Sequence, residues 1–247
     1  MKKTFLIFLV GLLISPLFAQ QDSSIAKERV RKNIIRVNLT SSIFNTIGFG
    51  YERVFKDRWS ANLTVSFKPK TELSSLFNFS GNGISFSGSP TISGYYITPE
   101  VRWYCDGNDV RKAPRGFYLG AYGRYSETYL KTSINYTDES NDLNADFKFT
   151  FREIGLGINI GYQLLAIKER LVLDFLFAGP RVSKYTLRSE ASTDLNGEFY
   201  QQLAENINDK LGFEFLDPNF EFENKRTQKV ETTALGYRYS IRIGYAF

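Results

Sequence analysis

Histidine is absent from the 247-residue sequence, and cysteine occurs once, as Cys105. Without histidine the chain cannot build a Ser-His-Asp or Cys-His catalytic arrangement. A lone cysteine cannot close an internal disulfide, so a disulfide framework is excluded as well. We interpret Cys105 as a packing residue rather than a nucleophile. The sequence therefore predicts a protein that is not an enzyme and that carries no cofactor.

Long apolar runs are missing beyond the first residues, and the mean hydropathy is −0.26. The exception, residues 5–14, follows Lys2 and Lys3 and is too short to span a bilayer comfortably. Ser15 and Pro16 break this run, and Ala19 offers a small residue before a cleavage point. We therefore expect a signal peptide rather than a membrane anchor. No cysteine follows the run, so a lipoprotein anchor is not expected.

The charge balance is mild and gives no sign of a nucleic-acid partner. The formal charge is +5, or +3 once Lys2 and Lys3 leave with the leader, and no basic run is present. Four acidic residues lie close together in one predicted loop, but their spacing matches no calcium-binding loop. They are Asp138, Glu139, Asp142 and Asp146. We interpret them as a solvated loop and predict no metal site.

What the sequence has is alternation of apolar and polar residues with a period of two, which is typical of strands with unlike faces. The last stretch, 235–247, alternates Leu, Tyr, Tyr, Ile, Ile, Tyr and Phe with Gly, Arg, Ser, Arg, Gly and Ala. Similar segments of about ten residues, the length that a tilted strand needs to cross a bilayer, precede it. They are 33–41, 46–53, 59–68, 94–105, 116–126, 151–164 and 171–181.

A last strand that ends on an aromatic residue of its apolar face resembles the C-terminal signal of bacterial outer-membrane barrels. In that signal, Tyr245 and Phe247 would be read by the barrel-assembly machinery. With its leader and strand pattern, the chain resembles small Gram-negative barrels of the OmpA-type transmembrane domain and OmpW-like families. The resemblance implies an all-β fold: an eight-stranded antiparallel transmembrane β-barrel with long extracellular loops. It places the protein in the cell outer membrane, with outer-membrane lipid and the assembly machinery as partners.

The enzymes among such barrels share a histidine that this chain lacks, which agrees with a non-enzymatic role. The chain stops at the last strand, so the peptidoglycan-binding domain of OmpA, and tethering to the cell wall, are not expected. The predicted divisions are a signal peptide at 1–19, a periplasmic N-terminal tail at 20–32 and the barrel at 33–247.

Loop lengths agree with this topology, because outer-membrane barrels place short turns in the periplasm and long loops outside. The short connections are 56–58, 106–115 and 167–169, and the long ones are 69–93, 127–150 and 188–232. The first connection, near 42–45, is short where a long one would fit. The alternation of short and long connections puts both termini in the periplasm.

The polar face is rich in glycine and carries charges of both signs, which suits the crowded interior of a small barrel. This favours a membrane barrel over a soluble, lipocalin-like barrel, whose apolar face would line a ligand cavity. A lumen of about eight strands is filled by side chains, so a wide pore is not expected. The expected lumen charge network is Arg36, Glu52, Lys68, Glu100, Arg102, Arg124, Glu153, Asp174, Arg238 and Arg242.

Pairing of the first two strands about a turn near Phe44 places Arg36 opposite Glu52, with Asn38 opposite Gly50 and Thr40 opposite Gly48. A buried ion pair would follow. Glu153 and Asp174, on neighbouring strands, could also be read as an acid–base pair. Polar filling of a small lumen explains both residues without chemistry, and we prefer that interpretation.

The connection from Arg188 to Thr232 carries apolar residues at every fourth position after Asn196, which predicts a short amphipathic helix. These residues are Phe199, Leu203, Ile207 and Leu211. The helix would either pack on the barrel rim or form a surface for a protein partner. Two function classes remain: a structural or interaction protein, for example an accessory subunit of an outer-membrane complex, and a narrow channel or lateral-path transporter for small or apolar solutes. A filled, charged lumen favours the first.

Overall fold

The computed structural model describes residues 31–73, 80–81, 84–105, 113–138, 141–192, 205 and 227–247. The predicted signal peptide, nearly all of the predicted tail at 20–32, and the predicted helix with Phe199, Leu203, Ile207 and Leu211 lie outside these residues. Within them, no helix is long and apolar enough to span a membrane.

The described chain is almost entirely antiparallel strand, with one short helix, α2 (Leu39–Ile43). The strands are β1 (Asn33–Asn38), β2 (Ile47–Lys56), β3 (Trp59–Glu72), β4 (Ser80–Gly81), β5 (Ile84–Tyr104), β6 (Gly116–Asp138), β7 (Asn141–Ala166), β8 (Leu171–Ala178), β9 (Arg181–Ala191), β10 (Thr227–Gly236) and β11 (Ser240–Ala246).

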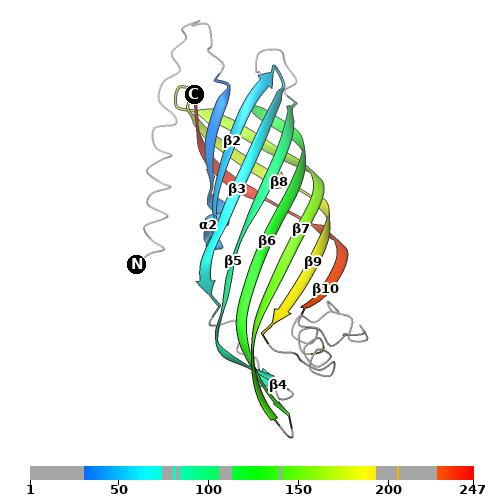
Figure 1. Ribbon diagram of the computed structural model, residues 1–247. Coiled ribbons are helices and arrows are strands. Elements are labelled where there is room, and N and C mark those ends of the chain that lie inside the picture. The colour runs from blue at the N-terminus through cyan, green and yellow to red at the C-terminus, as the bar shows by residue number, and fades with distance from the viewer. Residues whose placement is uncertain are drawn as a thin grey trace, which may run out of the picture.

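Eight of these strands close into a ring. β1, β2, β3, β5, β6, β7, β8 and β11 pair in that order, and β11 pairs back onto β1 (Figure 1). The predicted eight-stranded antiparallel barrel is therefore confirmed. The turns between β2 and β3 and between β7 and β8, with the C-terminus, lie at one end, which we call the short-turn end. The β6–β7 hairpin and α2 lie toward the other, the hairpin end (Figure 1).

The last two predicted strands are each broken in two. Gly179 and Pro180 separate β8 from β9, and residues 237–239 separate β10 from β11. Proline has no backbone N–H to donate to a ladder, which explains the first break. The backbone N–H of Arg238 donates to the Gly179 carbonyl at 3.0 Å, so the two breaks lie side by side. Beyond them β10 pairs with β9 alone among the described strands.

The predicted long loops at 69–93 and 127–150 are largely strand, so those assignments are wrong. β6 and β7 pair without interruption from Gly116 and Gln163 to Asp138 and Asn141. Their extensions are rich in Tyr, Thr, Ile and Phe, which favour strands, but lack a wholly apolar face. The predicted loop at 188–232 is likewise shortened by β9 and β10.

Helix α2 also replaces part of the first predicted strand. Asn38 caps it: the Asn38 side chain accepts a hydrogen bond from Ser41 N at 3.3 Å, and the Ser41 and Ser42 hydroxyls donate to the Asn38 carbonyl. Side chains of Ser and Asn that bond locally to the backbone compete with strand pairing. The chain therefore leaves the sheet after Asn38.

Apolar side chains point out of the barrel and polar ones point in. On β7, Ile154, Leu156 and Ile158 are 57%, 74% and 64% exposed, while the interleaved Glu153 and Asn159 are buried. A soluble barrel would show the opposite arrangement.

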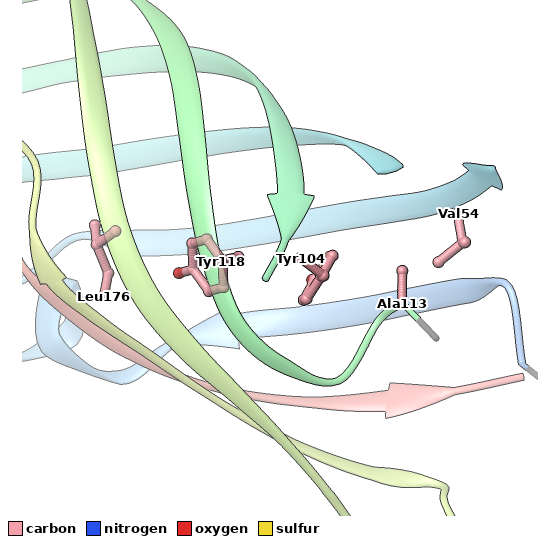
Figure 2. Packing of buried hydrophobic residues seen from close by; sticks show 5 residues of the cluster. All are labelled: Val54, Tyr104, Ala113, Tyr118 and Leu176. Carbon is pink, nitrogen blue, oxygen red and sulfur yellow. The ribbon is translucent and has the colours of Figure 1, made fainter. Parts of the chain in front are cut away.

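A small apolar cluster closes the short-turn end. Val54, Tyr104 and Ala113 lie toward this end, and Tyr118 and Leu176 extend the cluster along the lumen (Figure 2). The Ala113 N–H donates to the Asp57 carbonyl at 2.8 Å, which holds the connection against the β2–β3 turn. Buried side chains therefore occupy the lumen at this end.

Candidate functional site: the polar interior of the barrel

The centre of the lumen is filled by a group of buried charges that we call the plug. Its members come from β1, β2, β5, β8, β11 and the break before β11. They are Arg36, Arg102, Arg238, Arg242, Glu52, Glu100 and Asp174. All seven belong to the predicted lumen charge network.

Asp174 is the carboxylate with the most arginine partners in the plug. Its Oδ2 atom contacts the guanidinium groups of Arg36, Arg102 and Arg242, the last two at 3.1 and 3.2 Å. The Tyr118 hydroxyl donates to Oδ1 at 2.8 Å. The carboxylate is therefore surrounded by donors and screened from water.

The two glutamates are held in the same way. Glu52 contacts Arg36 and Arg102 and accepts from the Tyr104 hydroxyl at 2.7 Å. Glu100 contacts Arg102 and also Arg238, the latter at 2.9 Å. Buried charges are tolerated only when paired and hydrogen-bonded, and each plug carboxylate meets that condition.

A tyrosine ring and a glycine without a side chain position the plug arginines. The Arg102 guanidinium lies 4.2 Å from the centre of the Tyr118 ring, a cation–π distance. A Cβ at Gly50 would lie 2.9 Å from Arg36 Cγ, so glycine makes room for the arginine. The lumen at this level is therefore packed with side chains.

The predicted register of the first hairpin is wrong by two residues. Arg36 lies opposite Gly50, and Glu52 lies opposite Ile34. Helix α2 takes up residues that the prediction had paired, including Thr40, and this shifts the turn. Arg36 and Glu52 still form an ion pair, because the long arginine reaches its partner diagonally.

A second cluster, the Glu153 cluster, lies further toward the hairpin end. Glu153 contacts Arg124 Nε at 3.0 Å and Arg181 Nε at 2.5 Å, and it accepts from the Ser183 hydroxyl at 2.8 Å. Arg181 was not among the predicted lumen charges. Gly179 and Pro180 indicate a break in the strand just before it, and this break turns the Arg181 side chain toward the lumen. Glu153 and Asp174 thus belong to different clusters, and each is explained by its own arginines.

Between the plug and α2 lies a cavity of about 310 Å³. Four arginines line it: Arg124, Arg181, Arg238 and Arg242. The rest of its described lining is hydroxyl, amide and aromatic side chains with one leucine, and none of it is acidic.

The other predicted residues lie apart from the plug. Lys68 is half-buried and donates to the Phe44 carbonyl at 2.8 Å. Cys105 is half-buried, with Sγ 3.8 Å from the Trp103 carbonyl oxygen. Tyr245 and Phe247 point outward, and Phe247 exchanges backbone hydrogen bonds with Asn33 at 2.9 and 3.2 Å.

The predicted acidic loop is only partly covered by the described side chains. Asp146 accepts a hydrogen bond from the Ser133 hydroxyl, whereas the side chains of Asp138, Glu139 and Asp142 lie outside the description. Among the described residues, no three acidic, cysteine or histidine side chains are grouped to hold a metal ion.

On the outer face of β6, toward the hairpin end, Glu127 is the centre of a polar group. It accepts hydrogen bonds from Tyr125 and Tyr129 and pairs with Arg152 at 2.7 Å. The Tyr129 and Tyr125 hydroxyls, followed by Arg152, lower the pKa of Glu127 to about 2. The same bond raises the pKa of Tyr129 to about 12.

The chain was compared with protein families, curated proteins and solved structures. The sequence profile of the family described as Protein of unknown function (DUF3575) matches residues 8–196. No curated protein matches the chain. Among solved structures, the crystal structure of Acinetobacter baumannii CarO matches with a TM-score of 0.38 and 12% identity, over 90% of this chain and 99% of that one. At that similarity the match carries no argument about function.

Proposed function

Since this chain belongs to the family described as Protein of unknown function (DUF3575) and folds as a closed barrel, we propose that it is a non-enzymatic β-barrel of the bacterial outer membrane with a structural or interaction role. The observation that carries the proposal is the apolar belt around a charged interior. The plug supports a stabilising barrel rather than a wide pore.

The belt runs around the ring, and residues from all eight of its strands contribute to it. Examples are Ile35, Phe49, Leu63, Val101, Leu119, Ile158 and Ile241, each between 43% and 64% exposed. Soluble proteins rarely expose one apolar patch larger than a few hundred Å². Along β6 the belt extends from Phe117 to Tyr125, roughly 20 Å on a tilted strand, close to the apolar band of outer-membrane barrels.

Aromatic residues border this belt at the short-turn end, as membrane interfaces favour. Trp59 and Trp103 lie opposite each other on β3 and β5, and the rings of Phe117 and Tyr162 meet edge-on with centroids 4.9 Å apart. Phe247 follows β11 directly and is held next to the start of β1 by its backbone hydrogen bonds with Asn33. We propose that this end faces the periplasm and that the Tyr245–Phe247 face engages the assembly machinery.

Membrane insertion can be tested by expressing the full chain in a Gram-negative host and separating the membranes on a sucrose gradient. We expect the protein in the outer-membrane fraction, with a band that shifts on heating before gel electrophoresis. Phe247→Ala should reduce the folded, heat-shifting form. Phe55→Ala is the matched control, because Phe55 is also an exposed apolar residue but lies outside the last strand. A soluble protein without a heat shift would refute the proposal.

An interaction role can be tested by a pull-down of the tagged protein from outer membranes in mild detergent. A stoichiometric partner that is lost when residues 196–222 are deleted would identify an accessory subunit. A lone monomer would refute that form of the proposal and leave the stabilising barrel.

Transport by a lateral path is the second candidate, and one observation favours it. The cavity is lined by Tyr237, Arg238 and Tyr239, which form the break in the wall between β10 and β11. Beyond this break β10 pairs on one side only among the described strands. A sustained single-channel conductance in planar bilayers, or uptake by vesicles that contain the barrel, would support this candidate.

A further inference from the structure

The cavity between the plug and α2 has more positive than negative charge around it. Arg124 and Arg181 share the single carboxylate of Glu153. On the other side, the plug sets four arginines against three carboxylates. Each group therefore contributes about one uncompensated positive charge, and the described lining adds no acidic side chain.

Hydrogen-bonding capacity also remains unused there. Arg238 Nε and Thr98 Oγ1 are buried without a hydrogen-bond partner among the described residues, and both residues line the cavity. Buried polar atoms normally find a partner, so these two atoms leave hydrogen-bonding capacity unused beside the cavity. Asn38, Ser41 and Thr46 add further hydroxyl and amide groups on the α2 side.

Aromatic rings hold two of the arginines in place. The Arg124 guanidinium lies 4.1 Å from the centre of the Tyr96 ring, and that of Arg238 lies 3.6 Å from the centre of the Tyr122 ring. A planar guanidinium that is already oriented loses little freedom when it binds carboxylate or phosphate. The arrangement is therefore suited to anions rather than to neutral solutes.

We propose that this cavity binds a small hydroxylated anion, of the class of sugar phosphates and sugar acids. Its volume of about 310 Å³ matches the smaller pockets known for small molecules. The arginines would take the anionic group, and the hydroxyl and amide side chains near α2 would take the ligand hydroxyls.

The test uses the full chain in detergent micelles with ¹⁵N-labelled arginine, followed by NMR at constant ionic strength. Glucose 6-phosphate, glucose and glucosamine share a skeleton but differ in charge. We expect glucose 6-phosphate to shift the Nε–H signals of Arg124, Arg181 and Arg238 with at least tenfold higher affinity than glucose, and glucosamine to shift none. Equal affinity for all three sugars, or no shift with any, would overturn the proposal. So would inorganic phosphate binding as tightly as glucose 6-phosphate, because the hydroxyls would then play no part.

Variants assign the binding to this cavity. Arg124→Gln should weaken glucose 6-phosphate at least tenfold, and Thr46→Phe should do the same by filling the cavity without a change in charge. Arg115→Gln is the matched control, because it removes an arginine near the β7–β8 turn, where Arg115 pairs with Glu169. The heat shift on gels shows that each variant is folded, so a lack of binding by a folded barrel would refute this inference without touching the proposed membrane role. Unchanged affinity in both cavity variants would place the site elsewhere and refute it.

Discussion

Asp174→Asn tests the plug most directly, because Asp174 is the carboxylate that three arginines share. Its side chain is fully buried and contacts Arg36, Arg102 and Arg242 through one oxygen. Asparagine keeps the shape of the side chain but removes its charge. The variant would leave four arginines against two carboxylates among buried side chains.

The expected loss follows from the cost of an unpaired buried charge. Breaking a buried ion pair by removing one partner costs about 3–5 kcal/mol, which lowers the folding equilibrium constant by about 10²- to 10⁴-fold. Asp174→Asn combined with Arg242→Gln should recover part of the loss. Among the described residues, Arg242 pairs only with Asp174 and Ser240, so the double variant restores the original charge difference.

Equilibrium unfolding in guanidinium, followed by the fluorescence of Trp59 and Trp103, measures this free energy. Glu169→Gln is the matched control. Its partner Arg115 lies 3.9 Å away, and both side chains are about 30% exposed, so we expect a loss below about 1 kcal/mol. A loss in Asp174→Asn no larger than in the control would refute the description of the plug. A double variant that loses the sum of the two single losses would refute the sharing of charge.

Three further predictions concern other parts of the barrel. Glu153→Gln leaves Arg124 and Arg181 without their shared carboxylate and should cost about 1–3 kcal/mol in the same unfolding assay; no loss would contradict the cluster. Because the pKa of Glu127 is lowered to about 2, its carboxylate should stay ionised at pH 3 and lose its stabilising contacts only as the pH falls through about 2. Carboxyl ¹³C NMR, assigned with Glu127→Gln, measures this, and a midpoint near 4.5 would contradict it. Gly244→Ala would put a Cβ 2.4 Å from the Ile35 carbonyl oxygen. It should weaken the pairing of β1 with β11, which would be seen as loss of the heat shift. Gly123→Ala is the control and should keep the heat shift, because its Cβ would lie 3.6 Å from Pro99 Cγ.

The ring of strands could be predicted from the sequence because each strand needs apolar side chains on its outer face and polar ones on its inner face. In β7, Ile154, Leu156 and Ile158 face outward while Glu153 and Asn159 face the lumen, and this contrast is visible as a period of two. Beyond the belt both faces of a strand can be polar, so the contrast fades. The extensions of β6 and β7 toward Asp138 and Asn141 were therefore predicted as loop although they pair throughout.

The sequence predicts which charged side chains are buried more reliably than it predicts which of them form ion pairs. Inward charges follow from alternation alone, whereas their partners depend on register, and register depends on α2. The Asn38 cap that starts α2 is a local hydrogen-bond preference, and it leaves no trace in the alternation of apolar and polar residues. Arg36 and Glu52 pair despite the shifted register because a long side chain spans two positions. Lys68, near the end of its strand, instead donates to the Phe44 carbonyl.

The position of the plug separates the two candidate functions physically. A solute in the cavity lies on the hairpin side of Arg238 and Arg242. To cross the lumen it would have to separate plug arginines from three buried carboxylates, each held by at least two of them. Even one broken pair costs about 3–5 kcal/mol, and several would break together. We therefore expect passage through the lumen to be slow, so that transport would need movement of the wall at residues 237–239. A crosslink that ties Tyr239 to a neighbouring strand should abolish uptake if the protein is a lateral-path transporter, and should leave a structural barrel fully functional.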